Sequence, residues 1–258
     1  MIHPVSAFIP IDISGGRLVL SQHDFTIEAV LPIEFRRAHV TGSWAGRWFG
    51  PSWASTADQR LELGETGIRL VTEDGLLLTY PYPDGWEVLP EEGPPWPLSE
   101  GVEGEYLVWR AERILRFPPV AGGTVLPIGS VLDRLGNQIR FDYDDRGVFT
   151  GIEHPCGEYV QVSTEGGRIT ALTRGDVRVA GFRYEGGNLV EVTAAAGGTT
   201  RFRYDLDNRI VRWEDGDGRW CEFGYDDRDR CVRMDGLGST TRIEYDASGR
   251  PAAVQRDR

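Results

Sequence analysis

Phe223-Gly-Tyr225-Asp226 is one of five copies of a short motif, called here the repeat phrase. In each copy an apolar residue lies two positions before a tyrosine, and an acidic residue follows the tyrosine. The other copies are Phe141-Asp-Tyr143-Asp144, Phe182-Arg-Tyr184-Glu185, Phe202-Arg-Tyr204-Asp205 and Ile243-Glu-Tyr245-Asp246. The last four tyrosines are 20, 21 and 20 residues apart (184, 204, 225, 245), and a worn copy, Val-Gln-Val-Ser at 160–163, fills the longer gap after Tyr143. An internal period of this length indicates a repeat architecture.

Each copy predicts one β-hairpin. Residues two apart in a strand face the same side, so the Phe and Tyr of a copy share one face. The acidic residue after Tyr opens a turn, because its side chain can bond the backbone two residues on. Residue types that tolerate a positive φ stand four positions after Tyr, and they are Gly147, Asn208, Asp229 and Gly249. We therefore expect about six hairpins in series, forming one twisted antiparallel sheet over residues 125–258.

Composition supports an all-β chain and narrows the partners. Glycine accounts for 33 of 258 residues, and the glycines lie between short apolar runs as turn residues do. The 28 basic residues are all arginine, alternate with acidic residues, and leave a net charge of −12. Nucleic acids and anionic membranes bind concentrated basic faces, and none is visible here. We expect neither a nucleic-acid partner nor membrane insertion.

The amino terminus predicts synthesis in the cytoplasm. Met1-Ile-His-Pro-Val5 lacks the basic and then apolar pattern of a secretion signal. No apolar run approaches the ~20 residues of a membrane span. Export would then need a specialised secretion system. Cys156, Cys221 and Cys231 are too few and too irregularly spaced for a disulfide framework or a metal site, so we expect three buried free thiols, with Cys221 opposite Met234.

Residues 1–120 differ from the repeats and predict a small β domain. Strand-like runs occur at 17–20, 25–28, 33–35, 60–63, 68–71, 76–80, 106–109 and 114–117. Pro90–Pro97 is expected as an exposed loop, since proline cannot donate to a sheet ladder. The Pro118-Pro119 passage marks the boundary with a second domain, residues 121–258. Trp44, Trp48 and Trp53 are interpreted as core anchors, with a sugar-binding platform as the alternative.

The repeat phrase, read as Phe-x-Tyr-Asp-x-x-Asn/Asp/Gly-Arg, resembles the YD-repeat unit of the Rhs (rearrangement hotspot) family. Linking turns such as Asp133-Arg-Leu-Gly136 resemble the D-x-x-G turn of that family. The first half is similar to the β domain that opens Rhs shells. The residues that carry this second resemblance are Pro4-Val5, Asp24-Phe25, Leu31-Pro-Ile-Glu-Phe-Arg-Arg37 and Gly50-Pro-Ser-Trp53.

The resemblance implies a structural shell. YD repeats of the family coil into a hollow β cocoon around a C-terminal toxin that is delivered to competing cells. Family shells need many more repeats than six, and the self-cleavage signature DP-x-G-L is not found here. We therefore expect either the opening segment of a larger shell or a small free-standing relative. The expected partner is further shell or toxin polypeptide, or a second copy of the chain, docked on the C-terminal edge strand.

No catalytic, metal or cofactor site is expected. The carboxylates recur at the hairpin turns, which indicates a turn-forming role, whereas a glycosidase needs two of them facing each other across a cleft. The residues expected to matter are the repeat core, namely Phe141, Tyr143, Phe182, Tyr184, Phe202, Tyr204, Phe223, Tyr225, Ile243 and Tyr245. A carbohydrate- or cell-surface-binding module is the alternative function. It predicts exposed aromatic rows, whereas the shell predicts buried ones.

Overall fold

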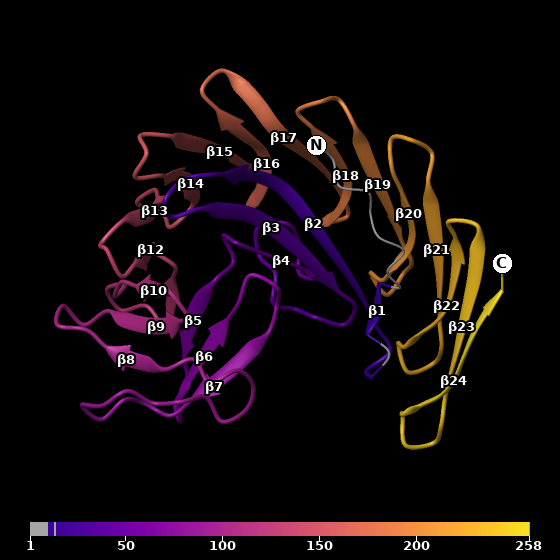
Figure 1. The fold of residues 1–258 in the computed structure, drawn as a ribbon, viewed down its shortest axis with the longest axis horizontal. Helices are drawn as coiled ribbons and strands as arrows, with labels where there is room; N and C mark the ends of the chain where they lie inside the picture. Colours follow the sequence, from indigo (N-terminus) through magenta and orange to yellow (C-terminus); the bar gives the residue numbers. More distant parts are fainter. Residues whose placement is uncertain (1–9, 13, 258) are drawn as a thin grey trace.

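The computed structural model describes residues 10–12 and 14–257, and every regular element among them is a β-strand (Figure 1). Twenty-four strands form three antiparallel sheets, which confirms the all-β prediction. In this part of the chain no helix is long and apolar enough to cross a membrane. His3, Pro4 and Val5 lie outside the described residues.

Two small sheets come from the first half of the chain, apart from one strand, β11 (Val125–Pro127). The first has the order β1 (Ile11–Asp12), β2 (Arg17–Ile27), β3 (Ile33–Val40) and β4 (Trp53–Ser55). The second has the order β11 (Val125–Pro127), β5 (Arg60–Leu63), β6 (Ile68–Val71) and β7 (Leu77–Tyr80). The runs 17–20 and 25–28 thus belong to one long strand, β2, with an irregular register between His23 and Phe25.

The third sheet has 16 strands and contains all the repeats. Its leading strands are β8 (Leu98–Glu100), β9 (Tyr106–Arg110), β10 (Arg113–Phe117) and β12 (Ser130–Asp133). Six hairpins follow in chain order: β13 (Gln138–Tyr143) with β14 (Phe149–Glu153), β15 (Tyr159–Glu165) with β16 (Arg168–Arg174), β17 (Val177–Glu185) with β18 (Asn188–Ala194), β19 (Thr199–Tyr204) with β20 (Ile210–Glu214), β21 (Trp220–Tyr225) with β22 (Cys231–Gly236), and β23 (Ser239–Tyr245) with β24 (Pro251–Asp257). The predicted series of six hairpins is confirmed.

Hydrogen bonding crosses the predicted domain boundary in both directions. Strand β10, from the first half, pairs with β12 so that Leu115 lies opposite Val131. Strand β11, from the second half, returns to pair with β5, with Leu126 opposite Leu61. The division at residue 120 stays a prediction. The two halves nevertheless share two of the three sheets, the 16-stranded sheet and the sheet that contains β5 and β11.

The long sheet is curved, and the β2–β3 hairpin lies inside its arc (Figure 1). Buried side chains of both halves form one continuous hydrophobic cluster that runs from Ile11 to Ile243. The inner face of the repeats is therefore filled by strands from the first half of the chain, which we call the leader (residues 10–80). Strand β24 has no buried side chain and pairs only with β23 among the described strands.

One turn geometry recurs along the repeats. The carboxylate of Asp226 accepts hydrogen bonds from the backbone N–H of Arg228 (3.0 Å) and of Arg230 (2.9 Å). The Arg230 side chain also donates to this carboxylate through Nε, at 2.8 Å. Asp144, Asp205, Asp246 and the linking residues Asp133 and Asp215 accept equivalent backbone bonds. The four positions predicted to need a positive φ all have one, which confirms that prediction: Gly147 (72°), Asn208 (59°), Asp229 (62°) and Gly249 (84°).

Two predictions about the cysteines are wrong. A bulge between Gly224 and Tyr225 shifts the register, so Cys221 lies opposite Gly236 and Phe223 lies opposite Met234. The same bulge lies immediately before the repeat tyrosine in the other four hairpins that carry the Phe-x-Tyr pattern or its Ile variant. In each of them the strand after the turn has one residue more than its partner at this point. Cys221 and Cys231 are buried as expected, but Cys156 is exposed because it lies in the β14–β15 turn.

Replacing Asp226 with Ala should lower the free energy of unfolding by about 1–2 kcal/mol, because two backbone N–H groups and Arg230 lose a charged acceptor. Burial alone would raise the pKa of Asp226, but hydrogen bonds from Arg230 and from the backbone hold it below its usual value. A carboxyl group whose pKa is lower in the folded state than in the unfolded state stabilises the fold at pH values above the unfolded-state pKa. The difference between the two proteins should therefore shrink as the pH falls below about 4.

Denaturant unfolding of both proteins at several pH values measures this difference. Asp227→Ala is the matched control, because Asp227 is exposed and its side chain makes no hydrogen bond to a described residue. Equal losses for the two variants would contradict the assigned role of Asp226.

Candidate interaction surface on the inner face of the repeats

The apolar residue of each repeat phrase lies on the inner face of the long sheet. Five such residues are buried: Phe141 (5% exposed), Phe182 (7%), Phe202 (2%), Phe223 (6%) and Ile243 (3%). The tyrosines Tyr143, Tyr184, Tyr204, Tyr225 and Tyr245 are partly buried and pack against the same cluster. All ten residues of the expected repeat core are therefore brought to one surface.

Aromatic side chains of the leader meet this surface. Phe49 packs edge-on to Phe182 with ring centroids 4.8 Å apart, and Trp53 packs in the same way on Phe202 at 5.1 Å. Trp48 and Trp53 are buried, as expected of core anchors, whereas Trp44 is 76% exposed. Successive leader aromatics thus contact successive hairpins, which fixes the position of the leader along the repeats.

The tyrosine hydroxyls form a ladder that the sequence patterns did not reveal. Four of the five donate to the backbone carbonyl 15 residues earlier, on the preceding hairpin or link. The bonds run from Tyr143 to Ile128 (3.0 Å), Tyr184 to Ile169 (2.6 Å), Tyr204 to Leu189 (2.7 Å) and Tyr225 to Ile210 (2.7 Å). Burial raises the pKa of all four hydroxyls, so they stay protonated donors at neutral pH. The near-constant spacing of the tyrosines was the one sequence signal for this ladder.

Tyr245 departs from the ladder. Its hydroxyl is buried and has no hydrogen-bond partner among the described residues, and the Arg230 guanidinium lies over its ring at 4.4 Å. The turn before β2 reaches this point, because the Cys231 N–H donates to the Gly16 carbonyl at 2.6 Å. A Cβ on Gly16 would lie 2.5 Å from Arg230 Cβ and 3.1 Å from the Tyr245 hydroxyl, so only glycine fits at this contact.

A buried ion pair lies between the leader and the repeats. Arg37 Nε and Nη2 donate to the two carboxylate oxygens of Asp24 at 2.7 and 2.8 Å, and the side chains are 1% and 3% exposed. The Arg37 guanidinium also lies 5.3, 5.3 and 5.0 Å from the ring centroids of Phe49, Trp53 and Phe182. The pair therefore joins β2, β3 and β17 in a site from which water is excluded.

A second buried carboxylate organises the loop that carries the leader aromatics. Asp58 accepts hydrogen bonds from the backbone N–H of Arg47 (2.6 Å) and Trp48 (3.0 Å) and from the Ser55 hydroxyl. Burial raises the pKa of Asp58 to about 6, and the bonds from Ser55, Trp48 and Arg47 oppose that shift. Burial lowers the pKa of His39 to about 3, so this imidazole is neutral at physiological pH. The Asp58 carboxylate thus holds residues 47, 48 and 55 of this loop together.

The polar groups of the repeats take part in hydrogen bonds and ion pairs that hold the turns and strands together. The repeated carboxylates are occupied by backbone N–H groups and arginines at the turns. Within residues 10–12 and 14–257, no group of three or more His, Cys, Asp or Glu side chains is placed to hold a metal ion. The inner face is thus a surface that binds other polypeptide segments, and here it binds the leader.

Replacing Tyr204 with Phe should destabilise the fold by about 1–3 kcal/mol, because the Leu189 carbonyl and the Trp53 indole N–H both lose a buried partner. Replacing it with Ala should cost about 3 kcal/mol or more. The equivalent Tyr245→Phe change is the control and should be neutral or slightly stabilising, because that hydroxyl is unpaired. Denaturant midpoints measure all three, and equal effects of the two Phe substitutions would refute the ladder.

Comparison with known proteins agrees with these features. Residues 9–80 match the family described as Domain of unknown function (DUF6531), and residues 185–219 match the RHS Repeat family. The chain is 26% identical over 256 residues to the Probable deoxyribonuclease RhsA of Dickeya dadantii (strain 3937), and 24% identical over 249 residues to the Probable deoxyribonuclease RhsB of the same strain. These matches cover 93% and 92% of the chain but only 18% and 17% of the relatives.

Among solved structures, the crystal structure of TcdB2-TccC3 matches 93% of this chain and 15% of its own, with a TM-score of 0.47 and 9% identity. The TcdB2-TccC3 structure without the hypervariable C-terminal region matches 86% and 14%, with a TM-score of 0.45 and 10% identity.

The leader match, the repeat match and the likeness of nearly the whole chain to two Rhs proteins agree with the YD phrase found in register five times. Together these findings support the identification of the chain as an Rhs/YD-repeat protein.

Proposed function

We propose that this chain is a structural segment of the shell of an Rhs/YD-repeat toxin, which encapsulates or presents a toxin domain for delivery to competing cells. The observation that carries the proposal is one continuous, curved sheet in which the repeat aromatics face inward and are buried. A wall of this kind needs strong contacts between successive hairpins, which the tyrosine ladder supplies.

The proposal assigns no catalysis to this segment. The relatives named as probable deoxyribonucleases are matched over less than a fifth of their length. We place any nuclease chemistry of those proteins outside the matched part. The carboxylates here that could serve as general acids or metal ligands are instead bound to turn backbone and arginines.

The carbohydrate- or cell-surface-binding alternative receives less support from the repeats. It requires aromatic rows that a glycan can reach, whereas the repeat phenylalanines are at most 7% exposed. The exposed tryptophans of the described residues form no row on one strand or on paired strands: Trp44 and Trp86 lie in loops, Trp109 in β9 and Trp220 in β21. Export by a specialised secretion system after synthesis in the cytoplasm is part of the proposal, as is the partner described next.

The partner is further shell or toxin polypeptide, or a second copy, docked on β24. This strand is the edge of the long sheet, and an edge strand presents unpaired N–H and C=O groups to another strand. Arg250 and Arg256 near the edge reduce such pairing without blocking it, because arginines can turn away from the backbone.

Competition between bacteria tests the proposed role. A strain whose natural protein carries Phe202→Asp should kill susceptible neighbours at least about tenfold less well, since a charge at this 2% exposed position opens the inner face. Arg203→Asp is the control, because Arg203 is an exposed residue next in sequence. If protease digestion showed that the Phe202→Asp segment is unfolded and the strain still killed as well as the parent, the proposed shell role would be wrong. Specific glycan binding that Trp44→Ala abolishes would favour the alternative.

Light scattering and amide exchange on the 258-residue chain test the edge. We expect association that depends on concentration, with slower exchange of the amides of residues 251–257 in the associated form. Strictly monomeric chains with protected amides in β24 would show that the edge is closed within one molecule and would remove the proposed docking site.

A further inference from the structure

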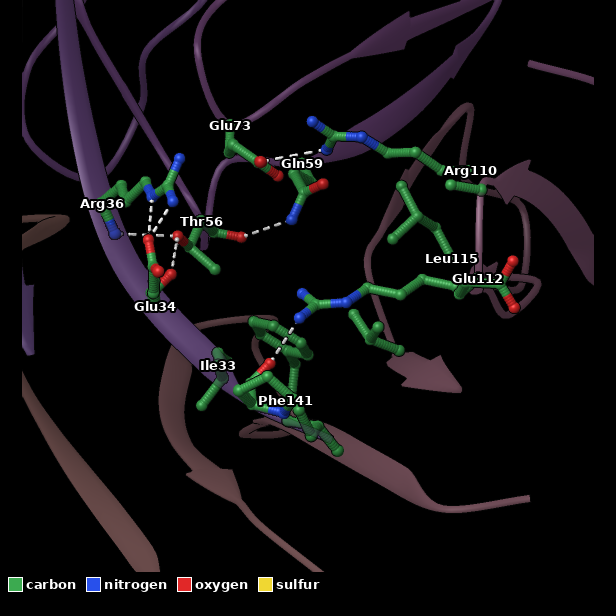
Figure 2. A pocket seen from close by; sticks show the side chains of 15 residues that line it. Ile33, Glu34, Arg36, Thr56, Gln59, Glu73, Arg110, Glu112, Leu115 and Phe141 are labelled. Atoms are coloured by element: carbon green, nitrogen blue, oxygen red, sulfur yellow. Dashed lines mark hydrogen bonds and ion pairs between the residues drawn. The ribbon is translucent and has the colours of Figure 1, made fainter. Parts of the chain in front are cut away.

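A cavity of about 420 Å³ lies between the leader, the β9–β10 turn and the inner side of strands β12 and β13 (Figure 2). Cavities of a few hundred Å³ are large enough for small ligands. This cavity is independent of the aromatic contacts described above, and the proposed shell function does not use it.

One wall of the cavity is apolar. Its side chains come from the leader, from β10 and from the repeat sheet, and all are at most 6% exposed: Ile33, Leu115, Val131, Ile139 and Phe141. This wall favours an apolar group, because transfer of such a group from water onto it is favourable. The charged side chains lie at the other sides, and those of Glu34 and Arg36 are about half exposed.

Gln59 brings an unsatisfied hydrogen-bond acceptor to the cavity. Its residue is 2% exposed, and its Nε2 donates to the Thr56 carbonyl at 3.1 Å. That bond fixes the orientation of the amide, since only the NH₂ side can donate. The other atom, Oε1, is buried and has no partner among the described residues, and it points away from Thr56 toward the space between Arg110 and Leu115 (Figure 2). A buried acceptor of this kind calls for a donor.

Arg113 brings a guanidinium that makes no direct ion pair with a described carboxylate, although Glu34 lies close enough to interact with its charge. Its Nη2 donates to the Pro32 carbonyl at 2.7 Å, and it forms no ion pair with a carboxylate of the described residues. The remaining N–H groups of the guanidinium are suited to a carboxylate, which they can bind through two parallel bonds.

The other charged groups at the cavity are already paired. Glu34 binds Arg36, and Glu73 binds Arg110 at 2.9 Å. Glu112 points away from the cavity in Figure 2 and lies 3.1 Å from Arg134. The free recognition groups are therefore one cation, one hydrogen-bond acceptor and an apolar wall.

We propose that this cavity binds an apolar amino-acid carboxylate, either a free amino acid or the carboxyl-terminal residue of a peptide. Its carboxylate binds Arg113, its N–H donates to Gln59 Oε1, and its side chain packs on Leu115 and Phe141. An α-amino acid carries a carboxylate, an N–H donor and a side chain on one carbon, which are the three kinds of group that this lining would bind.

The test compares an acid with its amide on the unmodified chain. We expect N-acetyl-leucine to bind at least about tenfold more tightly than N-acetyl-leucine amide, measured by calorimetry or ligand-observed NMR, because only the acid forms a charge-assisted pair with Arg113. Equal affinities, or no binding of either probe at millimolar concentration, would overturn the proposal.

Variants assign the two recognition groups separately. Arg113→Gln should abolish the preference for the acid, and Arg113→Lys should restore part of it. Gln59→Leu should weaken acid and amide alike by about tenfold and leave their ratio unchanged. Arg146→Gln is the control and should change neither value, since Arg146 is 84% exposed and neither it nor its ion-pair partner Asp144 lines the cavity. A preference for the acid that survives Arg113→Gln would refute the assignment.

Two further probes identify the source of the ligand. Tighter binding of leucyl-leucine than of leucine would assign the site to a peptide terminus, and the reverse order would assign it to a free amino acid. Thermal melting of each variant shows whether a lost affinity reflects unfolding.

Discussion

Arg37 and Asp24 form the contact on which the arrangement of the two halves depends. Both hydrogen bonds of the pair are short, both side chains are almost fully buried, and three aromatic rings surround the guanidinium. Arg37 Nη1 has no hydrogen-bond partner among the described residues, so π faces supply part of what water would give. Removing one member of such a pair costs about 3–5 kcal/mol, because an uncompensated charge stays buried. The leader and the hairpin that contains Phe182 must therefore meet in one register.

The spacing of the repeats then decides which tyrosines can bond. In the fourth and fifth hairpins the strand after the turn begins six residues past the tyrosine, at Ile210 and Cys231. Ile210 stands 15 residues before Tyr225, but Cys231 stands only 14 before Tyr245. Strands β22 and β23 are linked by a two-residue turn, Leu237-Gly238, and both of its residues have a positive φ. One residue fewer in the link therefore takes Tyr245 out of the ladder, and the Gly16 turn occupies that place.

Most of the repeat region could be predicted from the sequence, because its contacts are local. A hairpin fixes its own turn, so Asn208 and Asp229 could be identified as positions of positive φ from the tyrosine alone. The strand registers beyond the bulge could not be predicted. The pairing of Cys221 with Gly236 depends on an extra residue that the alternating pattern of apolar residues does not reveal. The filling of the inner face by the leader was also missed. It rests on contacts such as Trp53 to Tyr204, which are 151 residues apart in sequence. The same holds for the cavity, whose Gln59 lies in the β4–β5 loop and whose Arg113 lies in β10.

The length of the β2–β3 hairpin matches the stretch of repeats that it covers. Its distal end lies at β14–β15, where the His154 imidazole bonds the Leu31 carbonyl at 2.8 Å, and its other end lies at β22, where Gly16 bonds Cys231. Eight strand spacings separate β14 from β22, or about 38 Å, and the 11 residues of β2 extend about 36 Å. The leader thus reaches β22 and, through the Gly16 turn, Tyr245 at the end of β23. Strand β23 still contributes the buried Ile243 to the common cluster, whereas β24 has no buried side chain, so the side chains of β24 can become buried only against a segment other than residues 10–80.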